Sequence, residues 1–243
     1  GNDPFPDLDY ASIFGGTSSA APIVSGVLAL AKQVQPDLDS RFAKHLLART
    51  SQKIDPDDAA PQGGWQTNAA GYAFNNNYGF GLIDADALTF AATQFSRATE
   101  LQTISTGLAA VNSVVPNGDP SGVTAGFEIL QRSPLEEVEI RLDVSSSNAF
   151  YEDIEGVVTS PQGTTSRFLY ASGLEKILRD SEDNLVQTLD WTFTSNAFWG
   201  ENPQGVWTVT LYDRGLDDCG DQVCTPVQWN AVELMMRGGM LVP

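Results

Sequence analysis

The chain has 243 residues, of which 42% are hydrophobic and 9% aromatic, so it holds enough apolar material for one large or two ordinary domains. Its 31 acidic and 13 basic residues give a formal net charge of −18, which opposes binding to nucleic acid or to an anionic membrane surface. No apolar run reaches the roughly 20 residues that a membrane-spanning helix needs. We therefore expect no nucleic-acid partner and no membrane span.

The beginning of the chain predicts two helices. After Thr17, apolar residues recur at helical spacing as far as Val34, and Pro36 is expected to end this helix. Asp39 is expected to cap a second helix over residues 40–51, because its carboxylate can accept a hydrogen bond from a backbone N–H of the first turn.

A loop-rich stretch and a third helix follow. Residues 55–81 are rich in Asp, Pro, Gly and Asn, which predicts loop with at most a short hairpin around Trp65 and Tyr72. Asp84 is expected to cap the third helix over residues 85–95. A loop stretch of this length is unusual in a compact helical bundle, so we interpret this half as the end of a larger domain.

From about residue 100 the pattern changes to the alternation typical of strands. Segment 137–145 alternates polar residues with Val, Ile and Leu, and many short strands without helices indicate an antiparallel sandwich or jelly roll. We therefore predict a helical part over residues 1–96 and an all-β domain over residues 97–243. Further β-rich runs separated by turn residues occupy 154–161, 166–172, 188–195, 205–213 and 229–238.

The two cysteines, Cys219 and Cys224, lie together between two predicted strands. Four intervening residues suit a disulfide that closes the loop, and two thiols without a nearby histidine make a poor zinc site. This pairing predicts an oxidising compartment of the extracellular type. The alternative is a reduced, buried pair of thiols.

Residues 15–24, GGTSSAAPIV, carry two adjacent serines at the start of the first helix. If Thr17 caps this helix, Ser18 falls in the first turn, where unpaired N–H groups and the helix dipole can stabilise an oxyanion. Pro22 has no N–H to donate to the Ser18 carbonyl, and Gly16 permits close approach of a substrate backbone. The same properties suit any tightly packed helix start, so these residues alone leave both interpretations open.

Three segments of the first half resemble subtilisin-like serine proteases in order and spacing. Residues 16–22, GTSSAAP, are similar to the G-T-S-x-A-A-P signature around the nucleophile of that family. Residues 35–55 resemble the next helix of the kexin and furin branch, and residues 64–88 resemble the stretch that closes its catalytic domain.

The second half resembles the P or Homo B domain of kexin-like enzymes, through residues 159–169, residues 190–213 and the last strand around Trp229. The whole resemblance runs from about residue 14 to about residue 239. It implies an α/β fold class, namely the C-terminal helical part of a subtilisin-like parallel-sheet domain, followed by an all-β jelly-roll sandwich.

The resemblance implies that Ser18 is the nucleophile of a secreted serine endopeptidase, with Gly16 and Thr17 beside the substrate. A serine hydroxyl needs a histidine base and a carboxylate that orients it. In this family the Asp, the His and the oxyanion Asn precede the serine, so they would come from polypeptide outside this chain, and this chain alone is predicted to be inactive. The alternative is a non-catalytic β-sandwich module that stabilises or binds, with helices retained as an anchor.

His45 is the sole histidine of the chain and lies on the second predicted helix, beyond the serine. We interpret it as structural, because the family carries a structural residue at this position. The apolar face formed by Ile23, Val27 and Leu30 would be exposed unless another polypeptide covers it.

The resemblance also implies calcium, but the sequence does not identify the ligands. The acidic loop between the last two strands offers calcium candidates, with simple solvation as the alternative role. Residues in this group are Asp213, Asp217, Asp218 and Asp221, and a weaker group is Asp3, Asp7 and Asp9.

Trp199 and Trp207 could form a carbohydrate platform, but their strand context predicts core positions. Peptides or proteins are the expected substrates. The expected location is secreted or extracellular, with the periplasm as an alternative.

Overall fold

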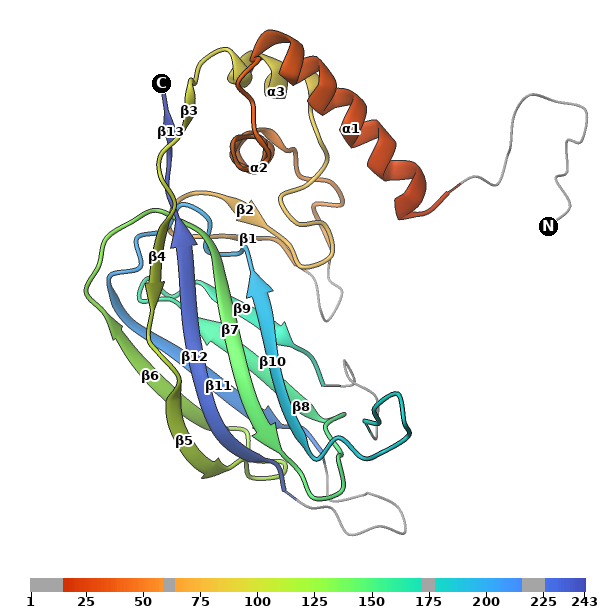
Figure 1. The fold of residues 1–243 in the computed structure, drawn as a ribbon, viewed down its shortest axis with the longest axis vertical. Coiled ribbons are helices and arrows are strands. Elements are labelled where there is room, and N and C mark those ends of the chain that lie inside the picture. Colours follow the sequence, from red (N-terminus) through yellow and green to blue (C-terminus); the bar gives the residue numbers. More distant parts are fainter. Residues whose placement is uncertain (1–14, 59–63, 172–177, 216–225) are drawn as a thin grey trace, which may run out of the picture. The chain divides into compact units, whose positions relative to one another are not determined.

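The computed structural model describes residues 15–58, 64–171, 178–215 and 226–243. The chain divides into two compact units (Figure 1). Unit 1 comprises Gly1–Gln52, Gly81–Ala98 and Leu241–Pro243, and unit 2 comprises Lys53–Phe80 and Thr99–Met240. The chain therefore passes from one unit to the other four times, after residues 52, 80, 98 and 240.

Unit 1 contains helices α1 (Thr17–Val34), α2 (Ser40–Thr50) and α3 (Ala85–Ala92). The two predicted caps are confirmed, since Asp39 accepts a hydrogen bond from Phe42 N at 2.7 Å and Asp84 accepts one from Ala87 N at 2.9 Å. Helix α1 ends at Val34, before Pro36 as predicted. None of the described helices combines the length and the apolarity of a membrane span.

A small apolar core holds unit 1 together. Helix α3 packs against both α1 and α2, and buried residues from all three helices meet there. The strands β3 (Arg97–Ala98) and β13 (Leu241–Val242) pair antiparallel, which adds Leu241 to this core. The residues that the core buries most completely are Ala31, Phe42, Leu46, Leu88 and Ala92.

Unit 2 is a sandwich of two antiparallel sheets. One sheet has the order β10-β7-β12-β4, with β5 also paired to β12, and the other has the order β6-β11-β8-β9. These topologies confirm the all-β architecture, while the jelly-roll connectivity stays a prediction. The strands are β4 (Gln102–Ser105), β5 (Ala109–Val114), β6 (Val123–Ile129), β7 (Leu135–Ser145), β8 (Ile154–Thr159), β9 (Thr165–Leu169), β10 (Thr188–Ser195), β11 (Gly205–Asp213) and β12 (Gln228–Gly238).

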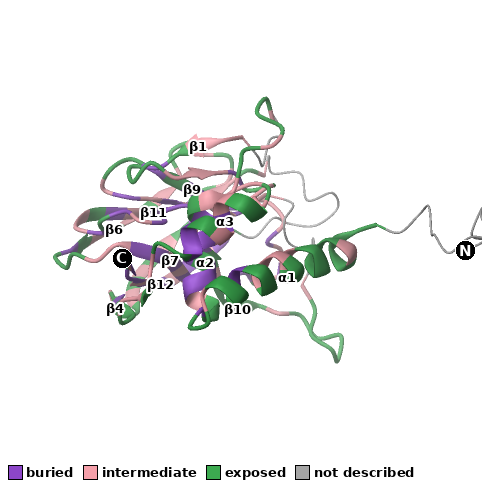
Figure 2. Cartoon of the chain, turned by 90° about the horizontal axis from the view of Figure 1, so that it is seen from above, coloured by how far each residue is buried: buried purple, intermediate pink, exposed green. Residues whose placement is uncertain are grey.

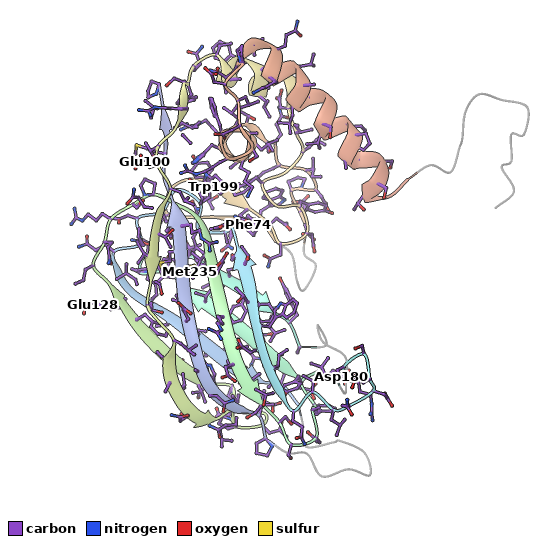
Figure 3. The ribbon with its side chains drawn as sticks, viewed as in Figure 1. Phe74, Glu100, Glu128, Asp180, Trp199 and Met235 are labelled. Carbon is purple, nitrogen blue, oxygen red and sulfur yellow. The ribbon has the colours of Figure 1, made fainter. Side chains whose placement is uncertain are left out.

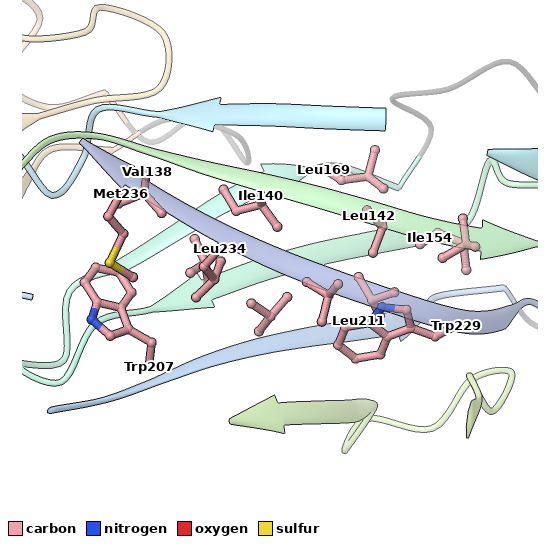
Figure 4. Close-up of a cluster of buried hydrophobic side chains, with 14 of the residues drawn as sticks. Val138, Ile140, Leu142, Ile154, Leu169, Trp207, Leu211, Trp229, Leu234 and Met236 are labelled. Carbon is pink, nitrogen blue, oxygen red and sulfur yellow. The ribbon is translucent and has the colours of Figure 1, made fainter. Parts of the chain in front are cut away.

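The alternation in the strand sequences produces the core between these sheets. On β7, Val138, Ile140 and Leu142 point inward with no exposed surface, and they face side chains of β8 and β11 (Figure 4). Trp207 and Trp229 are also fully buried. Because these inward residues come from strands far apart in the sequence, burial of the core is what joins the two sheets.

The structure includes the predicted hairpin, which consists of β1 (Gln66–Thr67) and β2 (Ala73–Phe74). Asn68, 4% exposed, lies between these strands, and its side chain makes four hydrogen bonds within unit 2. Its Nδ2 donates to the carbonyls of Ala197 and Trp199, both at 2.9 Å. Its Oδ1 accepts from the N–H groups of Ala70 at 3.0 Å and Tyr72 at 2.9 Å.

Aromatic contacts complete this attachment of the hairpin segment to the sandwich. The Phe80 ring meets the Trp199 indole edge to face at 5.7 Å, and it meets Phe74 in the same way at 5.4 Å. Figure 3 labels Phe74 and Trp199. The Glu201 carboxylate accepts a hydrogen bond from Ala69 N at 3.0 Å. Residues 53–80, which the sequence pattern groups with the helices, thus pack as part of unit 2.

Candidate functional site

Helix α1 begins at Thr17, with Gly16 as its N-cap at φ 89° and ψ 178°. The N-cap is therefore Gly16, and the condition that Thr17 caps the helix is not met. The backbone at Gly16 takes a positive φ that residues with a Cβ rarely adopt, and no side chain caps this helix end. Ser18 becomes the second residue of the helix, still in the first turn as expected.

The two adjacent serine hydroxyls differ in their contacts. The Ser19 Oγ donates a hydrogen bond to the carbonyl oxygen of Gly16 at 2.7 Å. Ser18 is exposed, and its hydroxyl has no hydrogen-bond partner among the residues that the structure describes. Ser18 is therefore the serine of this pair whose oxygen is available to react.

The first turn of α1 is polarised to hold negative charge near Ser18. The N–H groups of Ser19 and Ala20 bond to the Gly16 carbonyl at 3.1 and 3.3 Å, whereas those of Thr17 and Ser18 bond to no described residue. No acidic side chain in this turn competes for the unpaired N–H groups. This arrangement can donate hydrogen bonds to an oxyanion beside the Ser18 hydroxyl.

His45 is a buried residue of α2. It is 6% exposed and lies on the buried face of α2 that Phe42 and Leu46 share. The described residues include no hydrogen bond between Ser18 and His45. This burial supports the structural interpretation of His45.

The apolar face of α1 is largely open. Ile23 is 66% exposed and Leu30 is 52% exposed, while Val27 is half-buried against the core of unit 1. Figure 2 shows exposed residues along much of α1. The expectation of exposure is confirmed for Ile23 and Leu30, and it is wrong for Val27.

The calcium candidates and the cysteine pair fall mostly outside the described residues. Asp213 is described, and its carboxylate accepts a hydrogen bond from Gly215 N at 3.0 Å. A calcium ion takes about six to eight oxygen ligands, and no group of three or more acidic, His or Cys side chains placed to bind a metal occurs in the described part of the chain. The candidates outside it are Asp3, Asp7, Asp9, Asp217, Asp218, Asp221, Cys219 and Cys224.

Sequence reasoning missed the hydrogen bond that occupies Ser19. The spacing of Gly16 and Ser19 could have predicted this bond, because a serine three residues after a glycine N-cap can reach the carbonyl of that cap. The predicted substrate-side residues, Gly16 and Thr17, directly precede Ser18 and are exposed.

Two family models match successive parts of this chain. Residues 4–81 match the subtilase family, and residues 135–225 match the proprotein convertase P-domain. The chain therefore belongs to the subtilisin-like serine proteases of the kexin type, and it carries part of the catalytic domain together with a P-domain.

Several curated proteases are similar to most of this chain. Human proprotein convertase subtilisin/kexin type 4 is 34% identical over 209 residues, which cover 82% of this chain and 25% of the relative. The extracellular serine protease of Aeromonas sobria is 33% identical over 232 residues, covering 84% of this chain and 36% of the relative. The dibasic-processing endoprotease of Schizosaccharomyces pombe is 31% identical over 211 residues, covering 82% and 28%. The chain thus spans between a quarter and just over a third of the length of these relatives.

Two solved structures of the Aeromonas sobria serine protease share the fold. The protease in complex with its chaperone superposes with a TM-score of 0.78 at 24% identity, covering 96% of this chain and 45% of that chain. The protease without the chaperone gives a TM-score of 0.74, covering 93% and 44%. The helical unit and the β-sandwich therefore follow the architecture of a subtilisin-like protease with its P-domain.

Proposed function

We propose that Ser18 is the nucleophile of a secreted serine endopeptidase, and that this chain contributes the serine-bearing segment of its active site. The observation that carries the proposal is the contrast between the two serines of the motif. The Ser19 hydroxyl donates a hydrogen bond to the Gly16 carbonyl, while Ser18 is exposed in the first turn of α1.

The reaction that we propose is acyl transfer. The Ser18 Oγ attacks the carbonyl carbon of the scissile peptide bond, and its proton passes to a histidine supplied by polypeptide outside this chain. The N–H groups of the α1 first turn and an asparagine from that same polypeptide donate hydrogen bonds to the oxyanion. The amine leaves with the proton, and water then hydrolyses the Ser18 ester. On this proposal the chain alone is inactive.

In this proposal the β-sandwich stabilises the catalytic part, and peptides or proteins are the substrates. The secreted or extracellular location is supported by the similarity to an extracellular serine protease. The proposal includes calcium dependence, because the resemblance to the family implies it. No described set of residues fits a calcium ion, so no step above involves one.

One observation favours a second candidate function, a non-catalytic module. The sole histidine is buried on α2, so the described residues hold no base for Ser18. In this alternative the helices only anchor the sandwich, and Ser18 is an ordinary exposed residue of a helix start.

A fluorophosphonate probe, which reacts with activated serines, separates the two candidates. The protein is isolated with any polypeptide that accompanies it, and intact masses are measured before and after labelling. Because residues 1–31 contain no Lys or Arg, the tryptic peptide that ends at Lys32 contains Ser18 together with Ser12, Ser19 and Ser25. Fragment ions within that peptide then locate the adduct.

We expect one adduct on Ser18 in material that contains a second fragment with a histidine and an aspartate. The Ser18→Ala variant should not be labelled, while the matched Ser19→Ala variant should keep labelling. Material that contains the second fragment and never labels, or that labels equally at Ser19, contradicts the catalytic role of Ser18 and favours the module.

A further inference from the structure

Strand β10 forms one edge of the five-stranded sheet of unit 2. All eight of its residues pair in continuous antiparallel register with β7, and its other side has no partner strand among the described residues (Figure 1). In an antiparallel pair, alternate residues direct both their N–H and C=O groups away from the partner. Half of the β10 backbone groups therefore face outward, and no described backbone group pairs with them.

Proteins normally protect such an edge with proline, lysine, a bulge or an inward-pointing charge. Strand β10 has the sequence TLDWTFTS and contains none of these devices. Its single charge, Asp190, is paired with Arg141 at 2.7 Å. By comparison, edge strand β9 is shorter, carries Arg167 and is irregular in register opposite Gly156. Strand β10 is thus open to the addition of a further strand.

The side chains on the inward-facing side of β10 show the same openness. Leu189, Trp191 and Phe193 are registered with Val144, Leu142 and Ile140 of β7, which are all buried in the core. Trp191 is nevertheless 60% exposed. Leu189 and Phe193 pack against the core, whereas Trp191 is not among the described residues packed there.

The approach to β10 is acidic. Residues 178–187 form the turn that leads directly into the strand, with an antiparallel bridge between Arg179 and Leu185. Three exposed carboxylates lie in this turn, those of Asp180, Glu182 and Asp183, against the one guanidinium of Arg179. Hydrogen bonds from Asn184 hold the pKa of Asp180 below its usual value, so this carboxylate is charged at neutral pH. Figure 3 shows Asp180 on this turn.

We propose that β10 is a docking site for an extended, basic segment of another protein, which adds to the sheet as a new edge strand. The free N–H and C=O groups of β10 would supply main-chain hydrogen bonds. Apolar side chains of the segment would contact Trp191, and its basic side chains would lie near the indole and the acidic turn. A second copy of this chain is a poorer occupant, because two molecules that each carry a formal charge of −18 repel each other.

The test uses the whole chain and a defined peptide probe. The probe is a fluorescein-labelled octapeptide that alternates Arg and Val, and its fluorescence anisotropy is measured as the protein is titrated. One control peptide is N-methylated at alternate residues, which removes the hydrogen bonds of one strand edge. A second control peptide carries Glu in place of Arg. Binding is measured at low salt and at about 150 mM salt, where the Debye length is about 8 Å.

A matched pair of variants locates the binding. Trp191→Lys places a lysine on the edge strand, while Val206→Lys places one at a position of similar exposure, 57%, on β11 in the middle of the other sheet. Both variants add one positive charge, so they change long-range attraction equally. We expect Trp191→Lys to weaken binding of the basic probe about fivefold or more relative to Val206→Lys.

Hydrogen exchange on the unaltered chain provides a measurement that does not depend on a variant folding. The basic probe should slow amide exchange in residues 188–195, and the N-methylated peptide should not. The proposal is overturned if the N-methylated or acidic peptide binds as well as the basic probe, or if both lysine variants weaken binding equally. It is also overturned if the protein alone forms a dimer that Trp191→Lys dissociates, because the occupant is then a second copy.

Discussion

Replacing Asn68 with alanine removes the amide that ties the hairpin of residues 66–74 to the loop after β10. The amide makes four hydrogen bonds of 2.9 to 3.0 Å. It is 4% exposed, and the residues that hold the accepting carbonyls, Ala197 and Trp199, are also buried. Water therefore has little access to the groups that the substitution leaves without a partner.

The magnitude follows from these contacts. A typical hydrogen bond contributes about 1 kcal/mol net, and leaving a buried polar group unpaired costs about 1–3 kcal/mol. Four bonds, with some relaxation around the smaller side chain, give an expected loss of about 3–5 kcal/mol in the free energy of unfolding of unit 2. This is a large part of the stability of a typical domain, which is about 5–15 kcal/mol.

Urea unfolding followed by tryptophan fluorescence measures this loss, because fluorescence reports on unit 2 alone. The midpoint should fall while the slope with urea concentration stays unchanged. The reason for this selectivity is that all five tryptophans lie in unit 2, at Trp65, Trp191, Trp199, Trp207 and Trp229.

The matched control is Asn77→Ala, which removes an exposed amide from the same segment. Its expected effect is within about 0.5 kcal/mol. If the two alanine variants unfold at the same urea concentration, Asn68 does not attach the hairpin to the sandwich and the reasoning fails.

Three further predictions concern unit 2. Burial raises the pKa of Tyr151 to about 12, whereas an unfolded tyrosine titrates near 10. The unfolded state therefore loses its proton first, and the free energy of unfolding should fall by roughly 2–3 kcal/mol between about pH 10 and pH 12. Urea unfolding of Tyr151→Phe at a series of pH values should show a smaller fall in the free energy of unfolding between about pH 10 and pH 12. If the fall is as large as in the unaltered chain, Tyr151 is not the group that causes it. Trp207→Ala should cost about 3–5 kcal/mol in the same assay, because the indole is fully buried and its Nε1 donates to the Pro203 carbonyl at 2.7 Å. A loss below about 1 kcal/mol would mean that the core does not depend on this ring. Gly200→Ala should destabilise the hairpin attachment, since φ is +78° and a Cβ there would lie 2.7 Å from Tyr72 Cε2. Proteolysis of residues 64–80 should then be faster in Gly200→Ala than in the control variant Gly163→Ala. Gly163 also has a positive φ, +89°, but a Cβ there would meet open space.

Local patterns predicted the elements whose formation depends on neighbouring residues. The carboxylates of Asp39 and Asp84 lie at helix starts, where capping needs only the next three residues. Strands β10 and β11 match the predicted runs 188–195 and 205–213 residue for residue, because turn residues bound both. The burial of Trp207 follows from the alternation along β11. Trp199 is also buried, but it lies in the turn after β10, so the strand context predicted for it is wrong. Because both indoles are buried, the carbohydrate platform is not supported.

The division of the chain into units depends on contacts that no local pattern records. Asn68 bonds to residues about 130 positions away, and Phe80 packs on Trp199. The strand β13 pairs with β3 across a similar separation in the sequence. A composition shift near residue 97 identifies where strands begin, but it does not report which distant segment completes each core.

The identity of the candidate nucleophile stays a prediction, and the local geometry around it was not predicted from the sequence. The family resemblance assigns the nucleophile to Ser18, and the structure shows that this residue is exposed. The choice of Gly16 over Thr17 as N-cap depends on a backbone angle, which residue preferences at a single position leave undetermined.

The four crossings of the chain between its units bear on how such a module can be transferred between genes. A contiguous piece over residues 99–240 would lack residues 53–80, so Trp199 would lose Phe80 and the carbonyls of Ala197 and Trp199 would lose the Asn68 amide. Recombination at one position near residue 97 would therefore separate the sandwich from a segment of its own fold. The sequence that encodes the complete β-sandwich is therefore discontinuous. It includes residues 53–80, which lie within the match to the subtilase family.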